Sequence, residues 1–222
     1  MQEDSVLLID KPSGMTSFGV VARVRRKLSQ QLGKKVKVGH TGTLDPFATG
    51  LMIIVTGKEC RNAGVYSKLD KVYEATIQLG QTSSTGDPEG EILEVSDIKP
   101  TLDEVNEALG QFIGEIQQTP PIYSAIKVNG KRAYKLARAG GTAETIEIPV
   151  RTVTIFSLEL INYSYPEIKI RVHVSSGTYI RTLAEDIGKV LGTGAYCTQL
   201  RRTKIADFSI DDSVLTSEYE TY

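Results

Sequence analysis

Two stretches of alternating hydrophobicity in the last third of the chain constrain the fold most strongly. Residues 151–161 and 167–174 both alternate, and in the second every other residue from Ile168 to Val174 is aliphatic. Successive side chains of a strand point to opposite faces, so this period of two indicates strands with one buried face. The two stretches are neighbours in the sequence, which favours an antiparallel pair joined by a short connection.

Helix signals lie between the expected strands. Thr16 or Ser17 is placed to cap a helix with apolar residues at helical spacing, and Thr101 and Glu104 fit a capping box before a helix that we expect to reach about Ile113. Interspersed helices and hairpin-joined strands predict an α+β fold with a mixed, mostly antiparallel central sheet flanked by helices. No repeat or flexible linker divides the chain, so we expect residues 1–222 to form a single domain.

The segment 120–149 reads differently from its surroundings. We expect a strand from Ser124 to Val128, a turn at Asn129-Gly130 and a short basic helix from Arg132 to Ala139. The glycines and the weak pattern that follow favour a mobile excursion, and long excursions from compact domains are often binding loops. The last strand region is expected to run from Tyr196 to about Ile210.

Composition excludes several classes of protein. The longest aliphatic run, Leu51 to Val55, is far shorter than the roughly 20 residues of a membrane span, and the acidic start MQEDSVLLID is unlike a secretory signal. Two cysteines and two histidines do not suggest a disulfide framework or a zinc site. We therefore expect a protein of the reducing cytoplasm without a structural zinc site.

The charge distribution is more informative than the net charge of −1. Residues 1–68 carry a net charge of +6, residues 69–120 carry −9, residues 121–204 carry +7 and residues 205–222 carry −5. Two basic blocks separated by an acidic one can fold into a positive face that holds a phosphate backbone. The alternative is that these charges are scattered over a solvated surface.

A polar, glycine-rich loop between two strands holds the best candidate for a catalytic group. The stretch KVGHTGTLDPFATGLMIIVTG, residues 37–57, runs from a short strand through this loop into an apolar strand. Asp45 lies in the loop directly before Pro46. An acid on a rigid loop is a plausible catalytic residue, whereas Asp before Pro is also ordinary turn chemistry. The local pattern leaves both interpretations open.

Six motifs together resemble the TruB-type tRNA pseudouridine synthases. They occur in the family's order from residue 8 to about residue 204: DKPSGMTS, GHTGTLDPFATGLMIIVTGKECR, KVYEATIQLG, QTPPIYSAIKVNGKRAYKLAR, SSGTYIRTLAEDIG and LRRT. The resemblance implies a pseudouridine synthase fold. It also implies isomerisation of uridine 55 in the T loop of tRNA to pseudouridine, with no cofactor and no metal, in a protein that we expect to be a monomer without membrane contact.

The resemblance also implies roles for individual residues. Asp45 is the expected nucleophile, and Tyr73 and Arg181 complete the expected catalytic set. His40 and Tyr73 occupy positions that contact RNA around the flipped base, and Tyr179 and Leu200 match positions that line the uracil pocket. Taken singly, each has a more ordinary structural role, such as core packing for Tyr73 or a surface ion pair for Arg181.

The chemistry is consistent with these roles. A carboxylate can add to C6 of the ring or to C1′ of the ribose, or it can assist elimination to a glycal, and the sequence does not choose among these routes. A neighbouring arginine would favour the ionised nucleophile. Extruding the base costs roughly a few kcal/mol, which stacking or filling by Tyr73 and His40 can offset in part.

The loop at residues 83–87 departs from the family's pattern. Family members commonly show Thr-Asp-Thr-x-Asp where this chain reads Ser83-Ser84-Thr85-Gly86-Asp87, so only the last Asp is retained. We expect Asp87 to tie its loop to Tyr179 or Arg181, or simply to form the turn before Pro88.

The segment 120–149 matches the family's RNA-gripping insertion, whose cations are expected to contact phosphates: Lys127, Lys131, Arg132, Lys135 and Arg138.

The C-terminal end departs from many family members. They continue into a small RNA-binding domain, whereas this sequence ends about twenty residues after LRRT with an acidic tail. We therefore expect a single catalytic domain over residues 1–222 that has no accessory C-terminal RNA-binding domain and reads mainly the T stem and loop. Two alternatives remain open: an inactive protein of the same fold that binds or folds tRNA, and an N-glycoside hydrolase using Asp45 and Asp87.

Overall fold

The computed structural model describes residues 3–128, 130–142 and 145–219. The chain divides into two compact units, one comprising Met1–Tyr73 and Leu200–Tyr222 and the other comprising Glu74–Gln199. Strands β4 (Lys71–Leu79) and β12 (Ala195–Ile205) contain residues of both units. No helix in the described part of the chain combines the length and hydropathy that crossing a bilayer requires.

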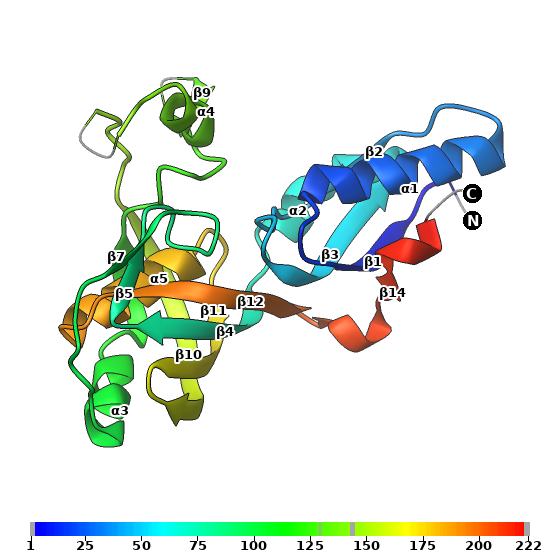
Figure 1. Ribbon diagram of the computed structural model, residues 1–222. Coiled ribbons are helices and arrows are strands. Elements are labelled where there is room, and N and C mark those ends of the chain that lie inside the picture. The colour runs from blue at the N-terminus through cyan, green and yellow to red at the C-terminus, as the bar shows by residue number, and fades with distance from the viewer. Residues whose placement is uncertain (1–2, 129, 143–144, 220–222) are drawn as a thin grey trace. The chain divides into compact units, whose positions relative to one another are not determined.

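The first unit is a sheet covered by one long helix (Figure 1). Its strands other than β4 and β12 are β1 (Val6–Lys11), β2 (Val38–His40), β3 (Thr49–Thr56), β13 (Phe208–Ser209) and β14 (Val214–Leu215). Its helices are α1 (Ser17–Leu32), α2 (Ala63–Ser67) and the 3-10 turns η1 (Gly57–Arg61), η2 (Ile210–Asp212) and η3 (Thr216–Tyr219). Strand β3 pairs antiparallel with β1 and β2 and parallel with the end of β12.

Helix α1 forms as the sequence pattern predicts. Thr16 is the N-cap and accepts a hydrogen bond from the Gly19 N–H at 3.0 Å, while Gly33 ends the helix with a left-handed φ of 63°. The buried positions fall on one stripe of the helix: Ser17, Val20, Val21, Val24 and Leu28. The predicted N-terminus of this helix is therefore confirmed, with Thr16 as the capping residue.

Strand β3 is the most buried strand of the first unit. Leu51, Ile53 and Val55 form a hydrophobic cluster with Ile205 on one face, and the alternate residues of β3 are fully buried as well. A strand covered on both faces reads as a continuous apolar run, which explains the aliphatic stretch at this position. Strands β2 and β3 therefore form a rigid support on both sides of the loop that carries Asp45.

The second unit is an antiparallel sheet with a protruding insertion. Its strands besides β4 and β12 are β5 (Gln81–Ser83), β6 (Ile92–Glu94), β7 (Gly114–Gln118), β8 (Lys127–Val128), β9 (Lys131–Arg132), β10 (Arg151–Ser164) and β11 (Glu167–Val174), and its helices are α3 (Leu102–Gly110), α4 (Ala133–Arg138) and α5 (Ile180–Val190). Strand β10 pairs antiparallel with β11 and with β7. Figure 1 shows the long β10–β11 hairpin, with α4 and β9 set apart from the sheet of this unit. The predicted α+β class with a mixed sheet is confirmed.

Three predicted element boundaries were wrong, each for a local reason. The strand expected from Ser124 to Val128 is limited to β8, because the carbonyls of Ser124 and Ile126 accept the N–H groups of Tyr134 and Ala133 at the start of α4. The last strand ends at Ile205 and not near Ile210, because Ala206 has a left-handed φ of 46° that turns the chain into β13. Helix α3 ends at Gly110, three residues before the expected end, because the N–H groups of Phe112 and Ile113 bond to the carbonyls three residues back in place of four. In the turn expected at Asn129-Gly130, the first residue lies outside the described part of the chain.

Candidate active site

Asp45 lies in the loop between β2 and β3, where its side chain is partly exposed. The loop is short and internally bonded, because the Ala48 N–H donates to the Asp45 carbonyl at 3.2 Å. Its first residue, Thr41, donates its N–H to the Ile53 carbonyl of β3 at 3.2 Å. The loop is therefore tied to the strand that follows it, which is a suitable setting for a carboxylate whose direction must be fixed.

The peptide groups before Asp45 are held by Ser17. The Ser17 hydroxyl accepts from the Leu44 N–H at 2.8 Å and donates to the Leu44 carbonyl at 2.9 Å. Ser17 is the first residue of α1 and is almost fully buried. One hydroxyl thus satisfies both backbone groups of the residue that precedes Asp45.

The peptide group after Asp45 is held from the segment DKPSGMTS. The Pro46 carbonyl accepts from the Gly14 N–H at 2.8 Å and from the Lys11 ammonium at 3.2 Å. The Lys11 ammonium also donates to the Met15 carbonyl at 2.7 Å, and its side chain has no exposed surface. The backbone on both sides of Asp45 is therefore bonded to side chains or backbone of residues 11–17.

Arg202 holds the same loop from β12. Its side chain is buried and donates to the Leu51 carbonyl at 2.7 Å and to the Gly42 carbonyl at 3.2 Å. The neighbouring contact requires glycine at position 50, because a Cβ there would lie 2.3 Å from the Arg202 carbonyl oxygen and the φ is +108°. The motif LRRT therefore contributes a buried arginine to the support of the Asp45 loop.

The other candidates of the first unit lie on its strands. His40 ends β2 opposite Ile54 of β3. Tyr73 on β4 and Leu200 on β12 are both about nine-tenths buried, with 8% of each side chain exposed. With Asp45, these three residues place four of the predicted site residues in the first unit.

Arg181 is the centre of a buried polar network in the second unit. The residue lies on the first turn of α5, and its side chain is only 3% exposed. Its guanidinium donates to the Thr85 carbonyl at 2.7 Å and to the Tyr123 carbonyl at 2.8 Å, and it forms an ion pair with Asp87 at 3.1 Å. The arginine therefore joins α5 to the loop after β5 and to the first residues of the insertion.

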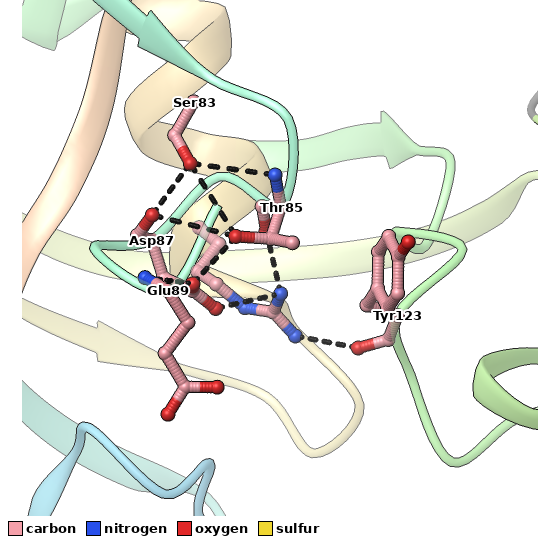
Figure 2. Close-up of polar contacts among 6 residues, drawn as sticks. Ser83, Thr85, Asp87, Glu89 and Tyr123 are labelled. Atoms are coloured by element: carbon pink, nitrogen blue, oxygen red, sulfur yellow. Dashed lines mark hydrogen bonds and ion pairs between the residues drawn. The ribbon is translucent and has the colours of Figure 1, made fainter. Parts of the chain in front are cut away.

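Asp87 is itself held by its own loop. Its carboxylate accepts from the Thr85 hydroxyl at 2.6 Å and from the Glu89 N–H at 3.0 Å, and Ser83 donates to its carbonyl at 2.5 Å. Figure 2 shows these contacts converging on the turn. The side chain thus forms the turn and binds Arg181 at the same time, so the two expectations for Asp87 are compatible.

A second carboxylate lies close to this network. Burial raises the pKa of Glu185 on α5, while Lys189 lowers it and Asp186 raises it. Gly86 in the turn next to α5 has a left-handed φ of +72°, which favours glycine at this position. Tyr179, the N-cap residue of α5, completes the candidates on this helix.

The insertion has a small core and a charged exterior. Its buried residues form one cluster: Ile126, Ala133, Ala137, Ile146 and Ile148. The five cations predicted to contact phosphates are all exposed: Lys127, Lys131, Arg132, Lys135 and Arg138. This arrangement leaves the cations available to a polyanion while the apolar residues hold the segment together.

The described residues contain no group of three or more His, Cys, Asp or Glu side chains that could hold a metal ion. The chemical groups that the candidate residues do provide are one carboxylate on a fixed loop, one buried guanidinium and several aromatic rings. A fixed carboxylate can serve as a nucleophile or a base, and the rings can stack on a nucleobase.

The sequence patterns did not identify all the supporting residues. Lys11, Ser17 and Arg202 lie within recognised motifs, but no contact with the Asp45 loop was predicted for them, and Ser17 was considered only as a helix cap. Gln118 precedes the Pro120-Pro121 pair within another motif and was also missed. All four act on backbone groups of distant residues, so their spacing in the sequence carries no signal of the contact.

Proteins of one family match the chain along nearly its whole length. The descriptions "TruB family pseudouridylate synthase (N terminal domain)" and "tRNA pseudouridylate synthase B C-terminal domain" match residues 25–180 and 181–220. Proteins named tRNA pseudouridine synthase B are 47% identical in Phocaeicola vulgatus, over 98% of this chain and 92% of that protein, and 44% identical in Aromatoleum aromaticum, over 98% and 68%.

Solved structures agree with these matches. A chain of a Cbf5-Nop10-Gar1 complex is similar with a TM-score of 0.72 and 29% identity, over 96% of this chain and 52% of that one. A chain of an H/ACA RNP bound to a substrate RNA containing 2′-deoxyuridine gives a TM-score of 0.68 and 27% identity, over 96% and 51%. This chain thus spans about half the length of these solved relatives.

The predicted fold and the predicted class of enzyme, a pseudouridine synthase, are confirmed. The chain belongs to the TruB family of pseudouridylate synthases.

Proposed function

We propose that this protein isomerises uridine 55 in the T loop of tRNA to pseudouridine, with Asp45 as the nucleophile. The observation that carries the proposal is the support of Asp45 in a chain of this family. Ser17 bonds both backbone groups of Leu44, which precedes Asp45. Lys11 and Gly14 bond the carbonyl of Pro46, which follows it. A carboxylate presented on such a loop reaches its target without a large cost of ordering.

The reaction needs the groups that the site candidates provide. The C–N glycosidic bond must break, the uracil must rotate, and a C–C bond must form through C5 of the ring. Asp45 can add to C6 or to C1′, or it can assist elimination to a glycal, and all three routes start from the ionised carboxylate. No redox step occurs, so the proposal includes no cofactor.

The target base has to leave the T loop before this chemistry. Extrusion costs roughly a few kcal/mol of stacking and pairing. We assign His40 and Tyr73 to contacts around the extruded base, with Tyr73 also in the catalytic set, and Tyr179 and Leu200 to the lining of the uracil pocket. Aromatic rings and an apolar side chain suit this role because they offset the lost stacking.

Arg181 is the second charged member of the proposed catalytic set. Its contacts with Asp87 and two carbonyls hold the guanidinium in a fixed position inside the second unit. A planar, permanently charged group that is already oriented can bind an anionic or carbonyl oxygen with little further ordering. Asp87 supports this function by fixing Arg181.

The proposed RNA partner is the T stem and loop, which the exposed cations of residues 120–149 contact through phosphates. The insertion carries five exposed lysines and arginines, and phosphate contacts of this kind supply sequence-independent affinity. We further propose that the protein acts as a monomer in the cytoplasm, where its two cysteines stay reduced.

The test uses tRNA labelled with tritium at C5 of uridine. Wild type is expected to release the label to water, and Asp45→Asn is expected to release none while still binding tRNA, because the amide lacks the nucleophilic charge. Asp97→Asn removes an exposed carboxylate of the second unit and serves as the matched control, with release expected at the wild-type rate. Equal release by Asp45→Asn would remove Asp45 from the mechanism, and free uracil among the products would indicate a hydrolase instead.

A further inference from the structure

Gln118 makes two hydrogen bonds to the backbone of one residue. It is the last residue of β7, and only 1% of its surface is exposed. Its side-chain amide donates to the Tyr179 carbonyl at 3.1 Å, and its side-chain oxygen accepts from the Tyr179 N–H at 3.0 Å. The amide therefore pairs with Tyr179 as a neighbouring strand would, and both of its polar ends are satisfied.

Tyr179 lacks the usual means of fixing the first turn of a helix. It is the N-cap residue of α5, with φ −104° and ψ 111°, and its side chain makes no capping hydrogen bond. An N-cap residue is normally Ser, Thr, Asp or Asn, whose side chain accepts an N–H of the first turn. The Tyr179 carbonyl accepts the Leu183 N–H at 3.1 Å, so the backbone is helical from this point onward. What fixes Tyr179 itself is the bond pair from β7.

The consequence for the ring of Tyr179 is geometrical. When the backbone on both sides of Cα is bonded, the position of the ring depends only on two side-chain torsions, and few staggered rotamers are available. Arg181 follows two residues later, and its guanidinium donates to the Tyr123 carbonyl. Two residues outside α5 thus hold its first turn. Gln118 bonds the backbone of Tyr179, and the Tyr123 carbonyl accepts a hydrogen bond from the Arg181 guanidinium.

We propose that Gln118 is a positioning residue that sets Tyr179 for the extruded uracil, an inference that rests on the proposed function. Gln118 touches the backbone of Tyr179 and acts on the substrate only through it. The competing explanation is that Gln118 is a satisfied core amide whose loss affects folding alone. The two differ in whether folded protein lacking the bond pair is slower in the chemical step.

The main variants are Gln118→Met and Gln118→Glu, with Gln117→Met as the matched control. Methionine keeps the length and the apolar contacts and removes both hydrogen bonds. Gln117 is the adjacent residue on β7, exposed, with its amide donated to the Thr152 hydroxyl at 2.9 Å. Each variant is compared with wild type in unfolding midpoint, affinity for tRNA and single-turnover rate of tritium release at saturating protein.

Gln118→Met is expected to lower the single-turnover rate about 10- to 100-fold, as loss of orientation typically does, with affinity for tRNA within about threefold of wild type. Gln117→Met is expected to match wild type in both. A wild-type rate in folded Gln118→Met would overturn the proposal.

Gln118→Glu keeps the proposal testable where methionine does not fold. The ionised glutamate accepts from the Tyr179 N–H but turns a second acceptor toward the carbonyl, whereas the protonated acid restores the donor. The rate of Gln118→Glu relative to wild type is therefore expected to rise as pH is lowered from about 8.5 to about 6, since a carboxyl in this buried position favours its neutral form. A relative rate near one at every pH would also overturn the proposal.

A third measurement separates this proposal from the proposed function. Hydrogen exchange of the Tyr179 amide is expected to be faster in Gln118→Met than in Gln117→Met, whatever reaction the enzyme catalyses. Lack of tritium release by wild type would reject the proposed function, and with it the role of Tyr179, even if the exchange result holds. Tritium release by wild type with unchanged exchange in Gln118→Met would reject the positioning role alone.

Discussion

At the scale of the residue, the molecule shows two ion pairs in opposite settings. The Arg181–Asp87 pair is buried, with side-chain exposures of 3% and 6%, whereas the Arg201–Asp10 pair is partly exposed, at 41% and 18%. Both join an arginine to an aspartate at hydrogen-bonding distance. Because water screens an exposed pair and does not reach a buried one, their energetic weight differs.

We predict that Asp87→Asn destabilises the protein by on the order of 3 kcal/mol, because it removes the carboxylate partner of a buried guanidinium. Asp10→Asn is the matched change at the partly exposed pair and is expected to cost less than Asp87→Asn, about 1 kcal/mol. Urea unfolding followed by circular dichroism measures both at pH 7. Similar losses in the two variants would contradict the burial argument. The single-turnover rate is also expected to fall in Asp87→Asn, since Arg181 loses part of its support.

The sequence predicted the residues with proposed functional roles more completely than it predicted the residues that fix them in position. Asp45, Arg181 and Asp87 were named from motifs, and the contact between the last two was one of the alternatives considered. The supporting contacts of Ser17 and Gln118 were not predicted, because they bind the backbone of residues 27 and 61 positions away. A hydroxyl or amide bonded to a distant backbone leaves no periodicity, spacing or charge pattern in a single sequence.

At the scale of the element, local signals predicted the structure where the chain satisfies its own backbone. The caps at Thr16 and Thr101 placed the starts of α1 and α3 correctly. The prediction failed at Ser124, whose carbonyl is used by α4 in place of a strand partner, and at Ala206, whose left-handed φ ends β12. In both places the outcome depends on which element competes for the backbone, and propensity alone does not decide that.

The junction of α2 with β4 contains a buried lysine. The Lys71 ammonium donates to the Ser67 carbonyl at 2.8 Å and to the Leu69 carbonyl, close to the end of α2. The pKa of Lys71 is lowered from 10.5 to about 8, mainly by burial and also by the nearby Arg202, while Asp70 opposes the shift. A cation at the C-terminal end of a helix is favourable, but here the cost of removing its water is larger.

We predict a pH-dependent stability difference between wild type and Lys71→Met. Below about pH 8 the lysine is charged in the folded and unfolded states, so the full cost of burying the charge is present. Between about pH 8 and pH 10.5 the unfolded chain binds more protons than the folded protein, so wild type gains stability by up to about 3 kcal/mol as the pH rises. Methionine cannot titrate, so the variant lacks this gain.

Urea unfolding of both proteins at several pH values measures this difference. Lys68→Met, which removes an exposed lysine three residues earlier, is the matched control. Its difference from wild type is expected to stay constant with pH, because an exposed ammonium is solvated similarly in both states. A constant difference for Lys71→Met as well would show that the lysine is not desolvated on folding.

At the scale of the whole molecule, residues of like charge are grouped in segments of the sequence, and the net charge does not reveal this grouping. The chain carries −1 overall, yet the acidic segment 69–120 carries −9 and is followed by the insertion with five exposed cations. The insertion buries its own apolar cluster and so presents these cations on a defined surface. Net charge alone would have argued against RNA, and only the order of the segments indicated a binding surface.

We predict that Lys131→Gln/Lys135→Gln weakens tRNA binding about tenfold at low salt and makes the plot of log affinity against log salt shallower by about 1 to 2. For each phosphate contact that is lost, tRNA binding releases fewer counterions, and the magnitude of the slope falls by roughly 0.7 to 0.9. The single-turnover rate at saturating protein is expected to stay within about twofold of wild type, because neither lysine belongs to the proposed catalytic set. Lys99→Gln, an exposed lysine within the acidic segment, is the matched control and is expected to leave the slope unchanged. Equal slopes for the double variant and wild type would remove these lysines from the RNA interface.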